Sequence, residues 1–290
     1  MADFRSSDPQ SGPSALQPDP STVSTRPSDP TRLNVLSLHS TKAPPAPAPV
    51  TASTNRWSLI RFLRRAIRTL VLITFAAALA IFLAIVGYRW IDPPTSTLML
   101  GQRLLGIPIT QSWRPLSAIS PNLARAVIMS EDAGFCRHRG VDWRELEAAY
   151  ERGQDGGSLG GGSTISMQVS KNLFLWPSRS YLRKAIEIPI TLTAEALWPK
   201  ARMLEVYLNI AEWGPGIFGA EAAARAYFNK PASALNEREA ALLATALPTP
   251  LTRNPRTPSD LHRRLGANIE NRMRASTSHI QCLPRATKAS

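Results

Sequence analysis

The sequence predicts a mainly α-helical domain behind a single N-terminal transmembrane helix. Three observations support this fold class. Residues 70–88 form a nineteen-residue run without a charge. From residue 120 onward, apolar residues recur at helical spacing, and helix-capping residues precede them. The 290 residues include 16 glycines and two cysteines, which excludes collagen-like and disulfide-rich classes.

The chain begins with a segment that carries no signal for regular structure. Residues 1–55 contain ten of the 25 prolines and have no net charge, and they show neither a helical nor a strand period. The stretch APPAPAP at 43–49 is typical of polyproline conformation. We expect a disordered tail here; the alternative is a tail that docks a partner. The next segment, 56–69, is basic, with five arginines and no acid.

The apolar run LVLITFAAALAIFLAIVGY has the length of a membrane span. A helix of nineteen residues covers roughly 28 Å, close to the thickness of the hydrocarbon core. The arginines precede the run, whereas only Arg89 and Asp92 follow it directly, which predicts a cytoplasmic N-terminus. Tyr88 and Trp90 stand where interfacial aromatics are common. A signal peptide would begin nearer the N-terminus, and a core helix would show a polar face.

The remaining residues, 89–290, carry a net charge of +8 and suffice for one extracytoplasmic domain. Ser120 and Pro121 form a typical helix start. Asn236 and Glu239 have the spacing of a capping box. The predicted elements are a linker with one strand over 92–118, a helix over 122–131, a helix near 200–212 and a helix that ends before Pro248. The second of these helices is expected to bury Leu204, Tyr207, Leu208 and Ala211 on one face.

A first cluster of candidate functional residues is SEDAGFCRHRGVD at 130–142. Glu131 and Asp132 close a predicted helix, and Phe135 and His138 follow in a loop-like stretch. A carboxylate at the mouth of an apolar pocket has a raised pKa and can serve as a general base or acid. Paired acids at a helix end are, however, usually solvated.

A second cluster, at 156–172, combines glycines with hydroxyl, amide and basic side chains. Five glycines occupy seven positions, and Ser163, Thr164, Gln168, Lys171 and Asn172 follow. This composition suits a phosphate-bearing ligand, although no Walker A loop is present. The alternative is a flexible loop followed by a helix cap.

A third cluster, at 179–189, places basic residues beside an acid. Arg179, Arg183 and Glu187 have the spacing of one helix face, and Lys184 flanks them. They form either a salt-bridged surface stripe or a cationic site for an anionic leaving group.

The two cysteines, Cys136 and Cys282, lie on the oxidising side of the membrane in this topology, so a disulfide is allowed but not required. The four histidines show no zinc-ligand spacing. The sequence therefore contains no metal motif.

Taken in order, the clusters resemble the motifs of the peptidoglycan glycosyltransferases of glycosyltransferase family 51. The resemblance covers about residues 98–275, and five motifs in family order make it specific. Within the family, a short chain with one anchor resembles the monofunctional biosynthetic transglycosylases. The matching motifs are SED-x-x-F-x-x-H-x-G-x-D at 130–142, GGSTIS-x-Q-x-x-KN at 161–172, RK-x-x-E at 183–187, K-x-x-x-L-E-x-YLN at 200–209 and the segment 216–250.

The resemblance implies a lysozyme-like, two-lobed transglycosylase domain that polymerises lipid II into glycan strands. It implies Glu131 as the general base that deprotonates the acceptor 4-hydroxyl for inverting attack, and undecaprenyl pyrophosphate as the leaving group. Glu187 is the second family carboxylate, near that pyrophosphate, which Lys171 and Arg179 bind with support from Arg183 and Lys184. The other substrate-binding candidates are Asp132, Phe135, His138, Ser163, Thr164, Gln168 and Asn172.

The resemblance also implies the location, the partners and the cofactor needs of the chain. We expect a single-pass protein of the bacterial inner membrane with a periplasmic catalytic domain. Its partners are lipid II, the growing glycan chain, the bilayer and, as an open option, cell-wall synthesis or division proteins, but not nucleic acid. No cofactor is expected to be required, although a divalent cation, Mg²⁺ or Mn²⁺, at the pyrophosphate stays an option.

One position departs from the family pattern, and two rival functions stay open. Many relatives carry two consecutive glutamines where this chain has Met167 and Gln168, so the first position loses an amide. A membrane-anchored lysozyme-type hydrolase would also use two carboxylates but needs no pyrophosphate site. A non-catalytic scaffold would not need the carboxylates. No SxxK or KTG motif follows the match, so transpeptidation is not expected.

Overall fold

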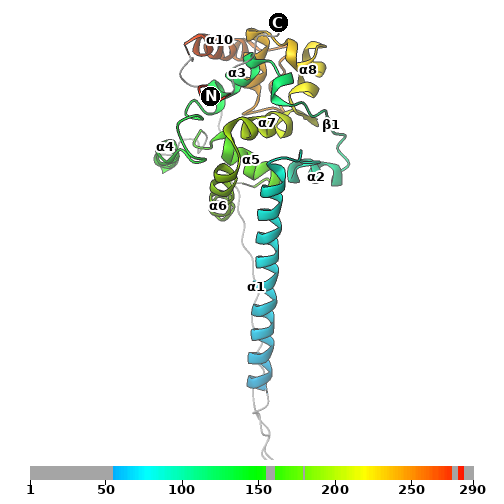
Figure 1. Ribbon diagram of the computed structural model, residues 1–290, viewed down its shortest axis with the longest axis vertical. Helices are drawn as coiled ribbons and strands as arrows, with labels where there is room; N and C mark the ends of the chain where they lie inside the picture. Colours follow the sequence, from blue (N-terminus) through cyan, green and yellow to red (C-terminus); the bar gives the residue numbers. More distant parts are fainter. Residues whose placement is uncertain (1–54, 155–160, 179, 276–279, 284–290) are drawn as a thin grey trace, which may run out of the picture. The chain divides into compact units, whose positions relative to one another are not determined.

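A computed structural model describes residues 55–154, 161–178, 180–275 and 280–283 of the chain (Figure 1). The tail predicted over residues 1–55 lies outside this range, apart from its last residue. Short stretches of irregular structure join the elements. In chain order these are α1 (Asn55–Tyr88), α2 (Thr97–Leu104), β1 (Thr110–Gln111), η1 (Leu116–Ala118), α3 (Pro121–Glu131), α4 (Trp143–Gln154), α5 (Ile165–Phe174), α6 (Tyr181–Leu197), α7 (Lys200–Ile210), β2 (Glu212–Gly214), β3 (Ile217–Phe218), α8 (Ala220–Phe228), η2 (Ala232–Ala234), α9 (Glu237–Ala246) and α10 (Asp260–Arg274).

The first helix has the length and composition of a membrane span. It begins at Asn55, so the basic segment 56–69 is helical as well as the apolar run. Its apolar side chains, such as Phe62, Phe75 and Phe82, are exposed, which is wrong for a core helix and right for a helix in lipid. The predicted single apolar anchor is thereby confirmed as a helix.

The C-terminal end of α1 is attached to the domain where α6 ends and α7 begins. The indole nitrogen of Trp198 donates a hydrogen bond of 2.7 Å to the carbonyl of Ile85. Arg202 on α7 donates to the carbonyls of Tyr88 and Ile91 at 2.9 and 2.8 Å and pairs with Asp92 at 2.8 Å. The bonds to Ile85 and Tyr88 satisfy carbonyls at the helix end, which have no partner within the helix.

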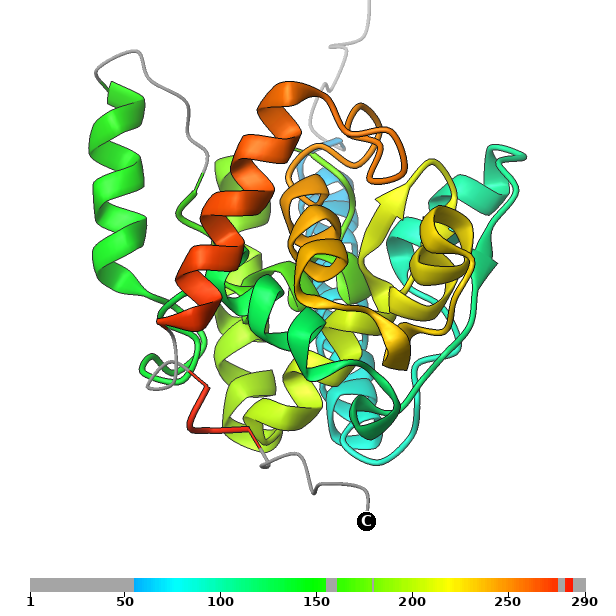
Figure 2. The same ribbon diagram turned by 90° about the horizontal axis from the view of Figure 1, so that it is seen from above.

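Two groups of helices enclose the core. Helices α5, α6 and α7 pack together near the end of α1 (Figure 1). Helices α3, α9 and α10 form the other group and lie side by side when seen from above (Figure 2). Leu123 and Val127 of α3 and Leu243 of α9 are fully buried between them. The mainly α-helical class is therefore confirmed, whereas the lysozyme-like, two-lobed description stays a prediction.

A small sheet links the segment after α1 to the later half of the domain. Its strand order is β1-β3-β2, with β1 parallel and β2 antiparallel to β3. Gly216 precedes β3 with a φ of +68°, and a Cβ there would lie 2.2 Å from the carbonyl oxygen of Pro108. Glycine is therefore required where these two segments meet.

The local helix signals are confirmed, and two details are corrected. Ser120 caps α3, and the capping box of Asn236 and Glu239 starts α9. The predicted helix 200–212 ends at Ile210, because the chain enters β2 at Glu212. The linker 92–118 contains the predicted strand but also α2, which was not predicted.

Helix α2 is stabilised mainly by contacts with residues that are distant in the sequence, and these contacts cannot be predicted from its own residues. The Ser96 side chain accepts from the backbone N–H of Met99 and caps the helix. The Thr97 hydroxyl donates to carbonyls of Asn172 at 2.9 Å and Leu175 at 2.5 Å, at the end of α5. With only eight residues and a central glycine, the segment depends on this docking.

Candidate active site

Glu131 is the last residue of α3 and lies half-buried at its C-terminal end. The buried face of α3 fixes the position of its backbone. The side-chain amide of Gln168 donates a hydrogen bond of 3.0 Å to Oε2 of Glu131. Burial raises the pKa of Glu131 above its usual value, while the hydrogen bond from Gln168 opposes that rise. The carboxylate is thus positioned and made more basic, as a proton acceptor requires.

A tyrosine supports this contact from the other side. The hydroxyl of Tyr207 on α7 donates to the side-chain oxygen of Gln168 at 3.2 Å, which fixes the orientation of the amide. Burial raises the pKa of Tyr207 well above its usual value, so the phenol stays protonated. The sequence placed Tyr207 on a buried face, which is correct, but gave no sign of this hydrogen bond. Its place in the fourth motif was the available signal.

Asp132 and His138 connect the end of α3 to the start of α5. Nε2 of His138 lies 2.9 Å from both carboxylate oxygens of Asp132. One of these oxygens also accepts the backbone N–H of Ile165 at 3.0 Å. Thr164 caps α5 and donates its hydroxyl to the carbonyl of Gly140 at 2.5 Å. These polar groups are largely buried, and their hydrogen bonds connect the loop after Glu131 to the N-terminal end of α5.

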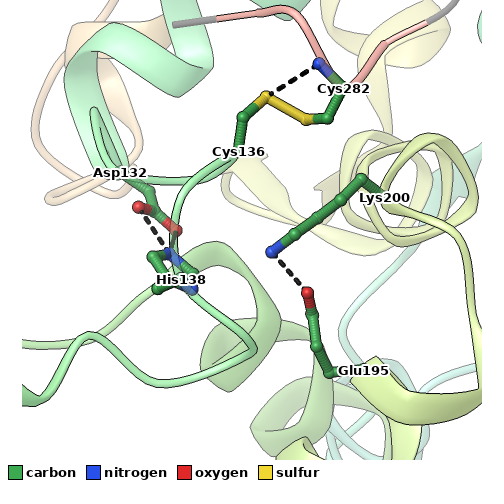
Figure 3. Close-up of a disulfide and its surroundings, with 6 residues drawn as sticks. All are labelled: Asp132, Cys136, His138, Glu195, Lys200 and Cys282. Carbon is green, nitrogen blue, oxygen red and sulfur yellow. Dashed lines mark hydrogen bonds and ion pairs between the residues drawn. A yellow bond between two sulfur atoms is a disulfide. The ribbon is translucent and has the colours of Figure 1, made fainter.

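The loop after α3 also contains a buried aromatic ring. Phe135 is fully buried, and the Lys200 ammonium lies 4.5 Å from its ring centroid. Lys200 forms an ion pair with Glu195 of α6 (Figure 3). Glu195 also accepts a hydrogen bond from the Ser166 hydroxyl at 2.7 Å. The fully buried ring packs within the domain, and the substrate contact of Phe135 stays a prediction.

Two basic residues of the third cluster meet at a buried carboxylate. Glu187 of α6 is 1% exposed and pairs with Arg183 through one oxygen. Its other oxygen pairs with Lys184 at 2.9 Å, and Lys184 also donates to Ser163 at 2.8 Å. Ser163 is exposed at this point. Two cations therefore share one anion, which leaves net positive charge where the resemblance implies a pyrophosphate.

Lys171 of α5 interacts electrostatically with both carboxylates, Glu187 and Glu131. Burial lowers the pKa of Lys171. The negative charge of Glu187 raises it, and that of Glu131 raises it by a smaller amount. Within the part of the chain that the structure describes, its ammonium group has no hydrogen bond or ion pair. A half-buried cation without a partner is suited to an anionic ligand.

The other predicted residues are placed as follows. Asn172 is a largely buried residue of α5 itself. Arg179 and residues 155–160 of the glycine-rich loop lie outside the described residues, and α6 begins after Arg179, at Tyr181. Met167 is fully buried with its sulfur 3.7 Å from Nζ of Lys184, so the missing amide does not face the site surface.

Cys136 and Cys282 form a disulfide with a Cα–Cα distance of 5.4 Å (Figure 3). The pairing that the sequence left open therefore exists. It joins the loop after α3 to the segment 280–283 near the C-terminus. Separately, no group of three His, Cys, Asp or Glu residues suited to a metal ion occurs in the described ranges.

Comparison with known proteins identifies the family of the chain. Residues 102–274 match the Transglycosylase family. The biosynthetic peptidoglycan transglycosylase of Rhodospirillum centenum is 51% identical over 210 residues, which cover 72% of this chain and 91% of the relative. Its counterpart in Agrobacterium fabrum is 48% identical over 190 residues, 66% of this chain and 84% of the relative. The family predicted from the five motifs is confirmed: the chain belongs to the transglycosylase family and is a peptidoglycan glycosyltransferase.

Proposed function

We propose that this glycosyltransferase extends glycan strands by inverting transfer, with Glu131 as the general base. Glu131 accepts the proton of the acceptor 4-hydroxyl while that oxygen attacks the anomeric carbon of the donor chain. The observation that carries the proposal is the half-buried carboxylate with a raised pKa, oriented by Gln168. A positioned base of this kind contributes about 10²–10⁴-fold to the rate.

The departing undecaprenyl pyrophosphate is stabilised by the cations on α5 and α6. Negative charge grows on the bridging oxygen as the glycosidic bond breaks, and fixed cations lower the energy of that state. Lys171 has no protein partner among the described residues and is the first candidate to bind the pyrophosphate. Glu187 holds Arg183 and Lys184 in place beside it. The role of Arg179 stays a prediction.

Several predicted substrate-binding residues act through position instead. Asp132, His138 and Thr164 use their polar groups on one another and on the backbone. We assign them to holding α5 and the loop after Glu131. The exposed Ser163 and the half-buried Gln168 remain the candidates for contact with sugar, and Asn172 stays a prediction.

The divalent cation that the resemblance left open finds a poor donor set here. Both oxygens of Glu187 are already bound by basic side chains, which repel a further cation. The mechanism therefore routes no step through a metal. Equal polymerisation with and without a chelator would support this choice, and loss of activity restored by Mg²⁺ or Mn²⁺ would contradict it.

The topology follows from the charges that flank α1. The apolar helix fits a single-pass anchor, and the arginines before it support a cytoplasmic N-terminus with a periplasmic domain. A disulfide in the domain supports the same orientation, because disulfides persist in the periplasm rather than in the cytosol. Cell-wall synthesis or division proteins stay predicted partners.

The decisive experiment is a gel assay of labelled lipid II with the detergent-solubilised chain. We expect high-mass glycan from the wild type and none from Glu131→Gln. Glu147→Gln is the matched control, since Glu147 is an exposed carboxylate on α4. Polymer from Glu131→Gln would refute the base assignment. Solubilisation of cell-wall sacculi by the wild type would favour the hydrolase, and a folded but inactive wild type would favour the scaffold.

A further inference from the structure

We infer that the Cys136–Cys282 disulfide is a positioning element of the catalytic centre, which holds the loop after Glu131 in the shape that orients this base. The inference rests on the proposed role of Glu131. It predicts that the oxidised chain turns over faster than the reduced chain even where both are fully folded.

The first step of the argument is the loop itself. It leaves α3 at Asp132 and returns on itself, with the N–H of Phe135 bonded to the carbonyl of Asp132 at 3.0 Å. The N–H of His138 bonds to the carbonyl of Gly134, and its ring closes the loop on the Asp132 carboxylate. Cys136 lies on this closed loop, five residues after the base.

The second step is what lies on the other side of the disulfide. Cys282 belongs to segment 280–283, which follows α10 by a few residues and packs on the core through Ile280 and Leu283. Its backbone N–H lies 3.3 Å from the Cys136 sulfur, beside the covalent bond (Figure 3). The disulfide thus anchors the outer side of the loop to a segment 146 residues away in sequence.

The third step connects the loop to the base. Asp132 receives both the His138 ring and the N–H of Ile165, the first residue of α5. Helix α5 in turn carries Gln168, the residue that binds Glu131. A shift of the loop therefore disturbs the base from two sides, through the chain and through α5. Misplacement by about 1 Å can cost a catalytic site roughly 10²-fold in rate.

The disulfide is reduced by ordinary thiol–disulfide exchange. A dithiol such as dithiothreitol attacks one sulfur, the S–S bond breaks and a mixed disulfide forms. The second thiol of the reductant then closes its own ring. Two electrons and two protons are transferred overall, which yields the thiols of Cys136 and Cys282 and the cyclic, oxidised reductant. Both cysteines are half-buried, so a small reductant has access.

The test compares the oxidised chain, the dithiothreitol-reduced chain and the double variant Cys136→Ser/Cys282→Ser in the lipid II assay. We expect the reduced chain and the double variant to lose about three- to tenfold in kcat, with KM within about twofold of the oxidised chain. Reoxidation should restore the wild type, and the double variant should not respond to reductant. Thermal unfolding of all three sets an assay temperature at which each is folded.

The outcomes separate this inference from the proposed function. Equal kcat for oxidised and reduced chains below their unfolding transitions would show that the disulfide only stabilises the fold, and would overturn the inference. If the Glu131→Gln variant instead made as much polymer as the wild type, the assignment of Glu131 as the general base would be refuted. Should the double variant fail to fold, reduction of the folded wild type, followed by near-UV circular dichroism, gives the same comparison.

Discussion

Replacing Gln168 with Met should shift the pH dependence of polymerisation in one direction. The substitution keeps an unbranched side chain of similar length but removes the amide that donates to Glu131. That hydrogen bond stabilises the ionised carboxylate and therefore lowers its pKa. Without it, the pKa of Glu131 rises further. Because a general base must be ionised, the acidic limb of the rate profile moves to higher pH.

The expected magnitude follows from the strength of a hydrogen bond to a charged group. Such bonds contribute about 1.5–3 kcal/mol, and about 1.4 kcal/mol corresponds to one pKa unit. Glu131 is only half-buried, so solvent replaces part of the lost contact. We expect a shift of about one unit in the acidic limb. At a pH below the limb the rate falls roughly tenfold, and on the plateau it falls less, because the lost amide also orients the carboxylate.

Initial rates of lipid II polymerisation between pH 5 and 9 measure this shift. Tyr207→Phe is the matched control, because it removes the hydroxyl that orients Gln168 but leaves the amide in place. Its limb should move by less than about half a unit, since the charged hydrogen bond survives. An acidic limb of Gln168→Met that stays in place, or moves to lower pH, would refute the argument.

Three further predictions concern charge and packing. Burial lowers the pKa of Lys171, so this side chain loses its charge at a lower pH than an ordinary lysine. Lys171→Arg should therefore move the alkaline limb of the pH–rate profile to higher pH. An unchanged limb would argue against a role of this charge. Glu187→Gln leaves two largely buried basic groups without their anion and should cost about 3 kcal/mol, a fall in Tm of roughly 6–12 °C by calorimetry. Gly216→Ala should lower the unfolding free energy by about 2–5 kcal/mol, because the added Cβ meets the carbonyl of Pro108. Gly106 is the control: it has a φ of +74°, but open space surrounds it. Gly106→Ala should therefore lower the unfolding free energy by only about 1–2 kcal/mol. Equal losses in chemical denaturation would contradict the steric argument.

Local signals in the sequence were reliable wherever the deciding contacts are themselves local. Ser120 and Pro121 start α3, and Asn236 with Glu239 start α9, because each cap is a hydrogen bond within three residues. The apolar run before Tyr88 is long enough to identify the anchor by length alone. Ordered motifs identified the family for the same reason, since their spacing is written in the chain.

Only the tertiary structure decided which of the candidate residues are buried and which of them contact one another. The family resemblance grouped Phe135 with the substrate-binding candidates, whereas the structure buries its ring completely, with Lys200 of α7 over it. The hydroxyl of Tyr207 reaches Gln168 from another helix, and Cys136 meets Cys282 across 146 residues. By itself, the sequence determined the anchor, the helical class, the family and the acidic and basic residues. Which of them meet depended on long-range packing, because burial and pairing arise from segments that are distant along the chain.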